Sequence, residues 1–239
     1  MIVAEFPRSG GSWVTYLLSY ILNIPMIDLD SKTPRPSDPL RRELLLGNWD
    51  RVKHSGQFRV AKTHKLPPSI DYLDREKTVL LVRDGRDVMV SYFCYLHQTR
   101  WTLRRKGLLL MDSVLHGTDG FQRFLSQHVP RWAKHVESHV VGADHLLRYE
   151  DLLVAPVEEL AALFRQMNLP VERDLVEHAV DLFSFENLSG GRQRGTEVQR
   201  AFFRKGVSGD WRKWFSERHL QIFMRVGGEE ALGTLGYLN

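Results

Sequence analysis

Short apolar runs alternate along this chain with segments in which apolar residues recur at helical spacing. The most continuous run, at residues 78–83 (TVLLVR), has the pattern of a strand that is buried on both faces of a parallel sheet. The apolar runs predict β-strands at residues 2–6, 58–62, 78–83 and 145–148. The helical spacing predicts helices at residues 12–22, 40–52, 85–96, 121–139, 157–167, 174–183 and 216–226.

Strands that alternate with helices predict the α/β fold class, here a three-layer α/β/α arrangement with a central parallel sheet. Residues 31–42 contain three prolines and are expected to form a surface loop. The sequence has no internal repeat, no low-complexity segment and no clear linker between two halves. We therefore expect a single domain over residues 1–239.

Composition narrows the class of protein. Hydrophobic residues make up 43% of the 239 positions, too many for a chain that is mainly disordered. The single cysteine, Cys94, excludes a disulfide scaffold and is typical of a reducing compartment. The apolar segment 14–24 is shorter than the roughly 20 residues that span a bilayer, and no basic leader precedes it. We expect a cytoplasmic protein without a transmembrane segment.

Positive charge is concentrated in one segment of the sequence. The chain has 33 Lys and Arg residues against 29 Asp and Glu residues, which gives a net charge of +4. Residues 188–207 account for this whole excess, because the rest of the chain has as many acidic as basic residues. We interpret the chain as a neutral body with one basic loop, whose charge suits a small anion. The charged residues of this loop are Arg192, Arg194, Glu197, Arg200, Arg204 and Lys205.

The first candidate for chemistry is the turn at residues 7–13 (PRSGGSW), between a predicted strand and a predicted helix. Gly10 and Gly11 allow a tight turn in which several N–H groups and the helix N-terminus face one anion. The loop of nucleoside triphosphatases, GxxxxGK[ST], has its lysine after the second glycine, whereas Arg8 precedes both glycines. The turn therefore predicts an anion site of another kind, or else a plain connection.

Two polar residues follow the strand predicted at residues 78–83. Arg83 ends this strand and Ser91 lies two helical turns later, so both are expected near the sheet edge where parallel sheets bind ligands. They are candidates for binding a second phosphate group. The alternatives are a surface ion pair of Arg83 with Asp84 or Asp87, and a Ser91 hydroxyl bonded to its own helix.

Two further segments carry basic residues to the same predicted edge. Lys62 and His64 lie at the end of the second predicted strand, where a histidine suits a general base and a lysine neutralises developing negative charge. Residues 204–211 (RKGVSGDW) place two cations before glycines. The alternatives are a solvated histidine and a solvated basic loop.

Together these segments resemble the cytosolic-type sulfotransferase family, which uses 3′-phosphoadenosine 5′-phosphosulfate (PAPS) as sulfonate donor. PRSGGSW is similar to the family's 5′-phosphosulfate loop PKxGTTW, and RDGRDVMVSY to its 3′-phosphate segment. KTH matches its catalytic segment, and RKGVSGDW matches its signature RKGxxGDW. YEDL and SFENL resemble two segments that line the nucleotide, so the likeness runs in order from residue 6 to residue 211.

The resemblance implies a P-loop-like sulfotransferase fold and an enzyme of the EC 2.8.2 class that needs no metal. Such an enzyme transfers sulfonate to a hydroxyl or amine of a small-molecule, saccharide or lipid acceptor and releases 3′-phosphoadenosine 5′-phosphate (PAP). His64 is implied as general base, largely neutral at pH 7 with an ordinary pKa of about 6.5, and Lys62 and Arg8 as charge-stabilising groups. The donor-binding residues implied are Arg8, Ser9, Gly10, Gly11, Ser12, Trp13, Arg83, Ser91, Tyr149, Ser184, Phe185, Phe202, Arg204, Lys205 and Gly206.

The sequence departs from the family pattern in several places. Arg8 replaces a lysine, and Gly11 and Ser12 replace two threonines. The family's dimer motif KxxxTVxxxE is degraded at residues 212–221, which leaves a homodimer possible but poorly supported. The sequence starts on its first predicted strand, without the leader that helps to enclose the acceptor in animal members of the family. The expected relative is a short bacterial member. Residues 97–116 combine arginines with leucines and are expected to form an acceptor lid, a membrane contact or a plain basic turn.

Two other functions remain open from the residues alone. A P-loop-like small-molecule kinase shares the strand, glycine turn and helix, although the position of Arg8 argues against ATP. A nucleic-acid-binding module would use the basic loop 188–207, with Phe202 and Phe203 for stacking. The family resemblance favours a small phosphorylated donor, and we expect no nucleic-acid partner.

Overall fold

The computed structural model of this chain describes residues 1–30, 60–67, 77–98, 120–198 and 201–238. In these ranges five strands form one sheet in the order β2-β3-β1-β4-β5, and every neighbouring pair is parallel. The strands are β1 (Ile2–Glu5), β2 (Met26–Asp28), β3 (Val60–Thr63), β4 (Thr78–Val82) and β5 (His145–Arg148). The predicted central parallel sheet is confirmed.

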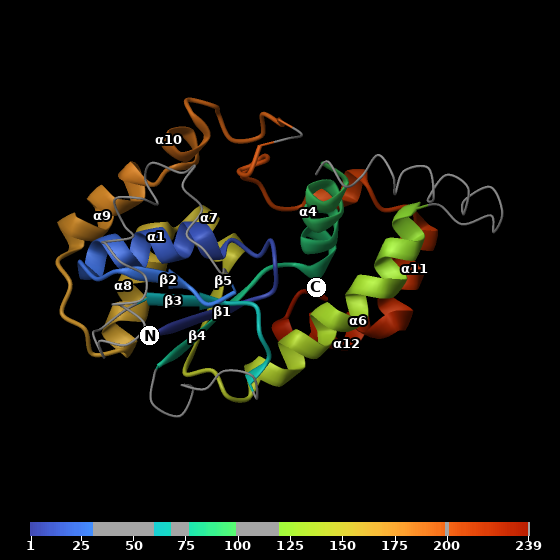
Figure 1. Ribbon diagram of the computed structural model, residues 1–239, viewed down its shortest axis with the longest axis horizontal. Helices are drawn as coiled ribbons and strands as arrows, with labels where there is room; N and C mark the ends of the chain where they lie inside the picture. The colour runs from blue at the N-terminus through green and yellow to red at the C-terminus, as the bar shows by residue number, and fades with distance from the viewer. Residues whose placement is uncertain (31–59, 68–76, 99–119, 199–200, 239) are drawn as a thin grey trace.

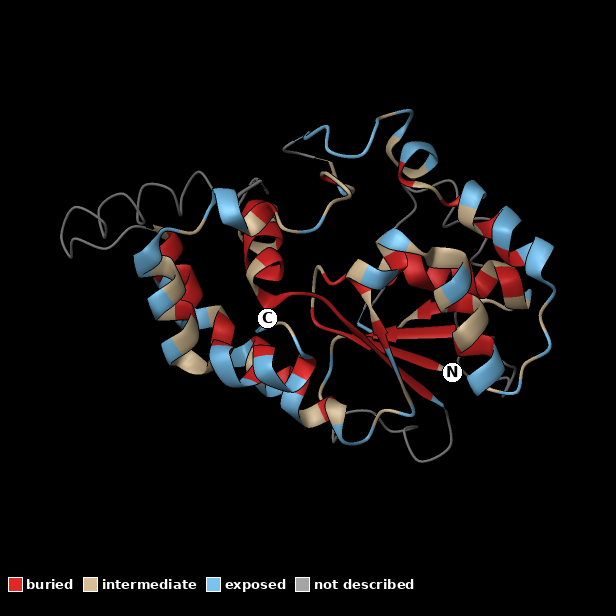
Figure 2. Ribbon diagram, turned by 180° about the vertical axis from the view of Figure 1, so that it is seen from behind, coloured by how far each residue is buried: buried red, intermediate tan, exposed pale blue. Residues whose placement is uncertain are grey.

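Both faces of the sheet are covered by apolar side chains. Along β4, Val79 and Leu81 belong to one buried cluster, while Leu80 and Val82 belong to another. Successive side chains of a strand point to opposite faces, so this strand is apolar at every position and lies between two layers of helices. Figure 2 shows the strands as buried and the outer faces of the helices as exposed. The predicted three-layer α/β/α arrangement is therefore confirmed.

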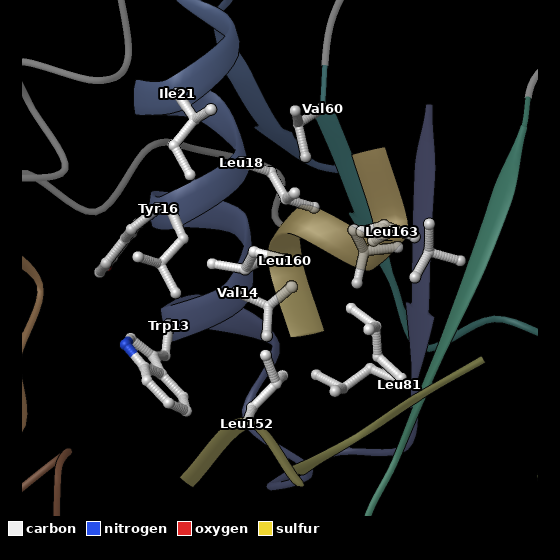
Figure 3. Packing of buried hydrophobic residues seen from close by; sticks show 14 of the residues in the cluster. Trp13, Val14, Tyr16, Leu18, Ile21, Val60, Leu81, Leu152, Leu160 and Leu163 are labelled. Carbon is white, nitrogen blue, oxygen red and sulfur yellow. The ribbon is translucent and has the colours of Figure 1, made fainter. Parts of the chain in front are cut away.

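One helical layer contains the helix that follows the glycine turn. Figure 3 shows Val14 and Leu18 of this helix meeting Leu160 and Leu81 in one apolar layer against the strands. Burial of apolar side chains on this helix and on the strands beneath it holds the helix in position. The glycine turn at its N-terminus is thereby also held in position. The helices of this layer are α1 (Gly11–Leu22), α7 (Tyr149–Val154), α8 (Pro156–Gln166) and α9 (Arg173–Leu182).

The other layer contains the helix that follows β4. Its residues Val88, Met89 and Val90 are fully buried, and the indole of Trp132 packs so closely that a Cβ at Gly85 would lie 2.4 Å from it. This contact sets the start of the helix beside the sheet edge. The helices of this layer are α4 (Gly85–Gln98), α6 (Gly120–Val140), α11 (Glu217–Phe223) and α12 (Glu229–Leu235), with one π-type turn, η4 (Met224–Gly228), between the last two.

The segment between the two layers carries part of the predicted basic loop. Figure 1 shows, in orange, the chain after α10 (Phe185–Ser189) running from the side of α9 to the side of α4. It ends at the short 3₁₀ turn η3 (Asp210–Lys213). The carboxylate of Asp87, in the first turn of α4, accepts hydrogen bonds from the N–H groups of Gly209 over 2.5 Å and Trp211 over 2.9 Å. Asp87 therefore anchors this segment to the sheet edge.

Several short elements of the structure were not predicted from the sequence. β2, α7, α10, η3 and α12 were not predicted, because each is too short or too polar to show a clear period. The expected helix 40–52, the expected loop 31–42 and most of the segment 97–116 lie outside the described residues. None of the described helices is long and apolar enough to cross a membrane.

Candidate active site

A cavity of about 350 Å³ opens where β1, β3 and β4 end. All but two of the residues predicted from the sequence line it, although they come from distant parts of the chain. The exceptions are Ser9, which is buried, and Ser184, whose hydroxyl caps α10 by accepting from the Asn187 N–H over 3.3 Å. The predicted residues in the lining are Arg8, Gly10, Gly11, Ser12, Trp13, Lys62, His64, Arg83, Ser91, Tyr149, Phe185, Phe202, Arg204, Lys205 and Gly206.

The glycine turn is tight and packs against an aromatic ring. Gly10 has φ 110°, and a Cβ there would lie 2.7 Å from the ring of Tyr149, so only glycine fits. The sequence led us to expect several N–H groups of this turn to face one anion, but two of them do not. The Ser9 N–H donates to the Phe6 carbonyl over 3.1 Å, and the Trp13 N–H donates to the Gly10 carbonyl over 3.0 Å. These two amides are used to close the turn itself.

Arg8 lies on the side of the cavity formed by α4. Its Nε donates to the Ser91 hydroxyl over 3.2 Å, and its Nη2 donates to the Phe202 carbonyl over 3.0 Å. Its guanidinium also lies 5.0 Å from the ring centre of Tyr95. Burial and the neighbouring charge of Arg83 lower its pKa. The structure therefore groups Arg8 with Arg83 and Ser91, two of the residues that were predicted to bind the 3′-phosphate.

Arg83 is buried and only partly paired. Its Nη1 donates to the Arg8 carbonyl over 3.2 Å and its Nη2 to the Val207 carbonyl over 3.0 Å, while its Nε has no partner among the described residues. The guanidinium lies 4.4 Å from the ring centre of Tyr149. The surface ion pair considered for Arg83 is not formed, because Asp84 pairs with Arg86 over 2.7 Å and Asp87 accepts the N–H groups of Gly209 and Trp211.

Two cations of the basic loop are already paired with carboxylates. Arg204 contacts Glu197 and Asp210, each over 2.8 Å, and Lys205 contacts Asp210 over 2.6 Å. Asp210 lies just beyond residues 188–207, so a charge sum over that range overestimates the free positive charge. Within the predicted basic loop, the charges of Arg204 and Lys205 are therefore balanced by carboxylates.

Arg192 and Arg194 use their guanidinium groups within the fold. Arg192 donates to the carbonyls of Ser189, Phe203 and Arg204 and so holds the two ends of the loop together. Arg194 donates to the Leu153 carbonyl over 3.1 Å. Arg192 thus organises the loop through its own backbone, and Arg194 ties the loop to α7. Arg200 lies outside the described residues.

His64 lies between two carboxylates. Its Nε2 is 3.3 Å from Oε1 of Glu5 and its Nδ1 is 3.2 Å from Oδ2 of Asp30, which also accepts the His64 backbone N–H over 2.6 Å. Burial opposes protonation, but the hydrogen bonds to Asp30 and Glu5 outweigh it and raise the pKa of His64 to about 9. The expectation that His64 is largely neutral at pH 7 is therefore wrong.

Lys62 completes this charged group. Its Nζ lies 3.3 Å from Oδ2 of Asp28, 3.5 Å from Nε2 of His64 and 3.8 Å from Oε1 of Glu5. The lysine and the histidine therefore share the Glu5 carboxylate. An anion that enters the cavity meets two neighbouring cations here, which are held in place by carboxylates at the ends of β1 and β2.

Sequence reasoning missed several residues of the cavity. Glu5 is an acidic residue in an otherwise apolar strand, which was an available signal. Asp28 and Asp30 follow a strand that was not predicted. The other lining residues outside the predicted set are Pro7, Tyr95, Leu153, Leu188, Arg194, Phe203 and Val207.

Comparison with known sequences extends these observations to the whole chain. A family model described as "Sulfotransferase domain" matches residues 1–234. Sulfotransferase 1B1 of Mus musculus is 25% identical over 264 aligned residues, covering 98% of this chain and 83% of the relative. Flavonol 3-sulfotransferase of Flaveria bidentis is 25% identical over 263 aligned residues, covering 99% of this chain and 82% of the relative.

Solved structures share the fold. Mouse sulfotransferase SULT7A1 complexed with PAP superposes with a TM-score of 0.70 at 17% identity, covering 100% of this chain and 88% of that one. Retinol dehydratase in complex with androsterone and inactive cofactor PAP superposes with a TM-score of 0.64 at 19% identity, covering 97% and 80%. At these identities the likeness shows the three-layer fold.

Proposed function

This chain belongs to the sulfotransferase domain family, and from that premise we propose that it transfers the sulfonate group of PAPS to a hydroxyl or amine. The proposed acceptor is a small molecule, a saccharide or a lipid, and the nucleotide product is PAP. The family match does not favour the kinase or the nucleic-acid-binding alternative. A cytoplasmic location, a single domain, a homodimer and a bacterial source stay predictions.

One observation carries the proposal. Arg83 and Trp13 are only 7% and 8% exposed, yet Nε of Arg83 and Nε1 of Trp13 have no hydrogen-bond partner among the described residues. Both residues line the cavity that also contains Lys62 and His64. Buried donors without acceptors cost free energy, so such groups are usually satisfied by a ligand or by water. A phosphorylated nucleotide fits this side of the cavity.

We propose that one side of the cavity binds the donor and that the other side carries out the transfer. Arg83, Ser91 and Arg8 form a cationic, hydroxyl-bearing corner that suits the 3′-phosphate of the donor. Trp13 and Tyr149 present rings beside it, at a centroid distance of 6.1 Å, and suit the adenine. We propose Arg8 as a donor-binding residue first, because its contacts lie on the Ser91 side. Its direct action on the leaving oxygen stays a prediction.

The other side of the cavity suits the transfer itself. When bound, the donor supplies an activated sulfonate group. Lys62 neutralises negative charge that develops on the oxygens around the sulfur, and His64 in its neutral form takes the proton of the acceptor. With a pKa of about 9, roughly one His64 in a hundred is neutral at pH 7. The proposal therefore implies turnover that increases towards alkaline pH.

The acceptor class is tested by labelled transfer. The full chain is incubated with radiolabelled PAPS together with one acceptor class at a time. The classes are phenols, amines, sugars and lipid headgroups. The proposal expects label on at least one acceptor class, with equimolar release of PAP. Transfer of the γ-phosphoryl group of ATP to the same panel, without any sulfonate transfer, would overturn it in favour of the kinase.

A further inference from the structure

Glu5 is a buried acidic residue of the cavity with no role yet in the proposed transfer. Its side chain is 3% exposed, and both carboxylate oxygens have partners. Oε2 accepts the backbone N–H of Gly11 over 2.6 Å, and Oε1 lies 3.3 Å from Nε2 of His64. One carboxylate therefore touches both the glycine turn and the histidine.

The strand register explains why these groups meet. In the parallel pair of β1 and β3, Ala4 pairs with Thr63, so the next residues, Glu5 at the end of β1 and His64 just past β3, lie side by side at the sheet edge. Asp28 pairs with Lys62 across β2 and β3, which brings Asp30 to the other side of His64. The arrangement follows from the sheet itself and not from a mobile loop.

Gly11 is matched to Glu5. A Cβ at position 11 would lie 2.0 Å from Oε1 and 2.1 Å from Cδ of Glu5, far inside van der Waals contact. The pattern PKxGTTW has a threonine where this chain has Gly11. The carboxylate of Glu5 fills the space beside the turn that a side chain would otherwise take. The glycine at this position is thus explained by the acid at the end of β1.

We propose that Glu5 is a positioning residue that holds His64 through Nε2 and ties it to the turn through the Gly11 amide. The Gly11 N–H is then a support for Glu5 and not a ligand of the donor. The proposal rests on the proposed function for its meaning, since it concerns the residue that takes the acceptor proton. Its tests use the protein without donor, so they fail independently of that function.

The charged and titratable groups around His64 come from several elements. Glu5 faces it from β1, Asp30 from the end of β2, Lys62 from its own strand β3 and His135 from α6. Lys62 opposes protonation of the ring, whereas the two carboxylates favour it. Removing the charge of Glu5 therefore leaves one stabilising carboxylate and one opposing cation.

The direct test is the titration of His64 by NMR in the full chain with isotope-labelled histidine. Glu5→Gln keeps the size and an acceptor oxygen but removes the charge. We expect the titration midpoint of His64 to fall by at least about one pH unit. Asp28→Asn is the matched control, because Asp28 contacts Lys62, and we expect less than half that shift. An unchanged midpoint in Glu5→Gln, or an equal shift in Asp28→Asn, would overturn the proposal.

A second test leaves Glu5 in place. Gly11→Ala puts a methyl group against the carboxylate, so we expect it to lower the Tm by about 3 °C or more and to move the His64 midpoint. In the background of Glu5→Ala, the same change at position 11 is expected to cost less than half as much. Strict additivity of the two changes in Tm would contradict a direct match between Glu5 and Gly11.

Discussion

The Nε of Arg8 donates to the hydroxyl of Ser91 over 3.2 Å, which joins the glycine turn to a helix 83 positions later in the chain. The same guanidinium reaches the Phe202 carbonyl in the segment that crosses between the two helical layers. Arg8 therefore connects three separate parts of the proposed donor site. Its fork geometry makes this possible, since two N–H groups point to different acceptors at once.

This relationship predicts that a lysine at position 8 cannot take over the function of Arg8, although the family pattern has lysine there. Arg8→Lys keeps the charge but loses one of the two directed contacts. We expect PAP affinity to fall about 10-fold by calorimetry, the scale of one hydrogen bond to a charged group. Normal affinity with a reduced kcat would show instead that Arg8 acts on the transfer step.

Arg83 is predicted to bind the 3′-phosphate of the donor. We expect Arg83→Ala to weaken PAP binding by about 10- to 100-fold, because a buried charged donor is lost. Arg86→Ala is the control three residues away, since Arg86 pairs with Asp84 and lies 4.1 Å from the ring centre of Trp211. It is expected to change stability more than affinity. Equal losses of PAP affinity in both variants would remove the specific assignment of Arg83.

The pKa of His64 predicts the pH dependence of turnover. A base must be neutral, and the raised pKa keeps His64 protonated until the pH passes about 9. We expect kcat/KM to rise with pH and to level off above about pH 9. His64→Ala should lower turnover by about 100-fold or more and flatten the profile. A profile that levels off near pH 6.5 would contradict the contacts with Glu5 and Asp30.

The same shift makes a prediction about stability. The folded pKa of His64 is raised above its unfolded value of about 6.5. Its protonation therefore contributes stability that is complete below about pH 6.5 and is lost as the pH rises through about 9. The check is the free energy of unfolding, measured by denaturant titration at several pH values between about 6.5 and 9. The same measurement on His64→Ala shows the pH dependence without this contribution. An identical pH dependence in the two proteins would show that His64 is not held as a cation.

Glu197 is predicted to compete with the donor. Its side chain is 30% exposed and faces Arg204 and Lys205, whereas Asp210 on the same cations is 3% exposed. We expect Glu197→Gln to tighten PAP binding about 3- to 10-fold, since two cations lose a competing charge. Weaker binding in this variant would mean that Glu197 orients Arg204 for the ligand.

The main features of the sheet and the site were predictable from the sequence for a physical reason. Apolar runs revealed strands, and ligands of parallel sheets gather at their carboxyl ends, so Lys62, Arg83 and the glycine turn were expected together. The short strand β2 was not predicted, because three residues show no period. With it the sequence analysis missed Asp28 and Asp30.

The protonation of His64 required the three-dimensional register. Its two carboxylate partners are 59 and 34 positions away in the sequence, and their approach depends on which strands are neighbours. The charge of the basic loop was misjudged for a related reason. Asp210 follows Lys205 by only a short turn, yet a sum that stops at residue 207 does not include it. Which charged residues form ion pairs depends on the folded structure and cannot be read from the charge sum of a sequence segment.

Whether this cavity binds the nucleotide of a sulfonate donor can be measured by a calorimetric comparison of ligands. The full chain at pH 7 is titrated with PAP, with ATP and Mg²⁺, and with a short oligonucleotide. We expect PAP to bind one-to-one and at least about 10-fold more tightly than the other two ligands. Preference for ATP with Mg²⁺, or tight and steeply salt-dependent binding of the oligonucleotide, would contradict it.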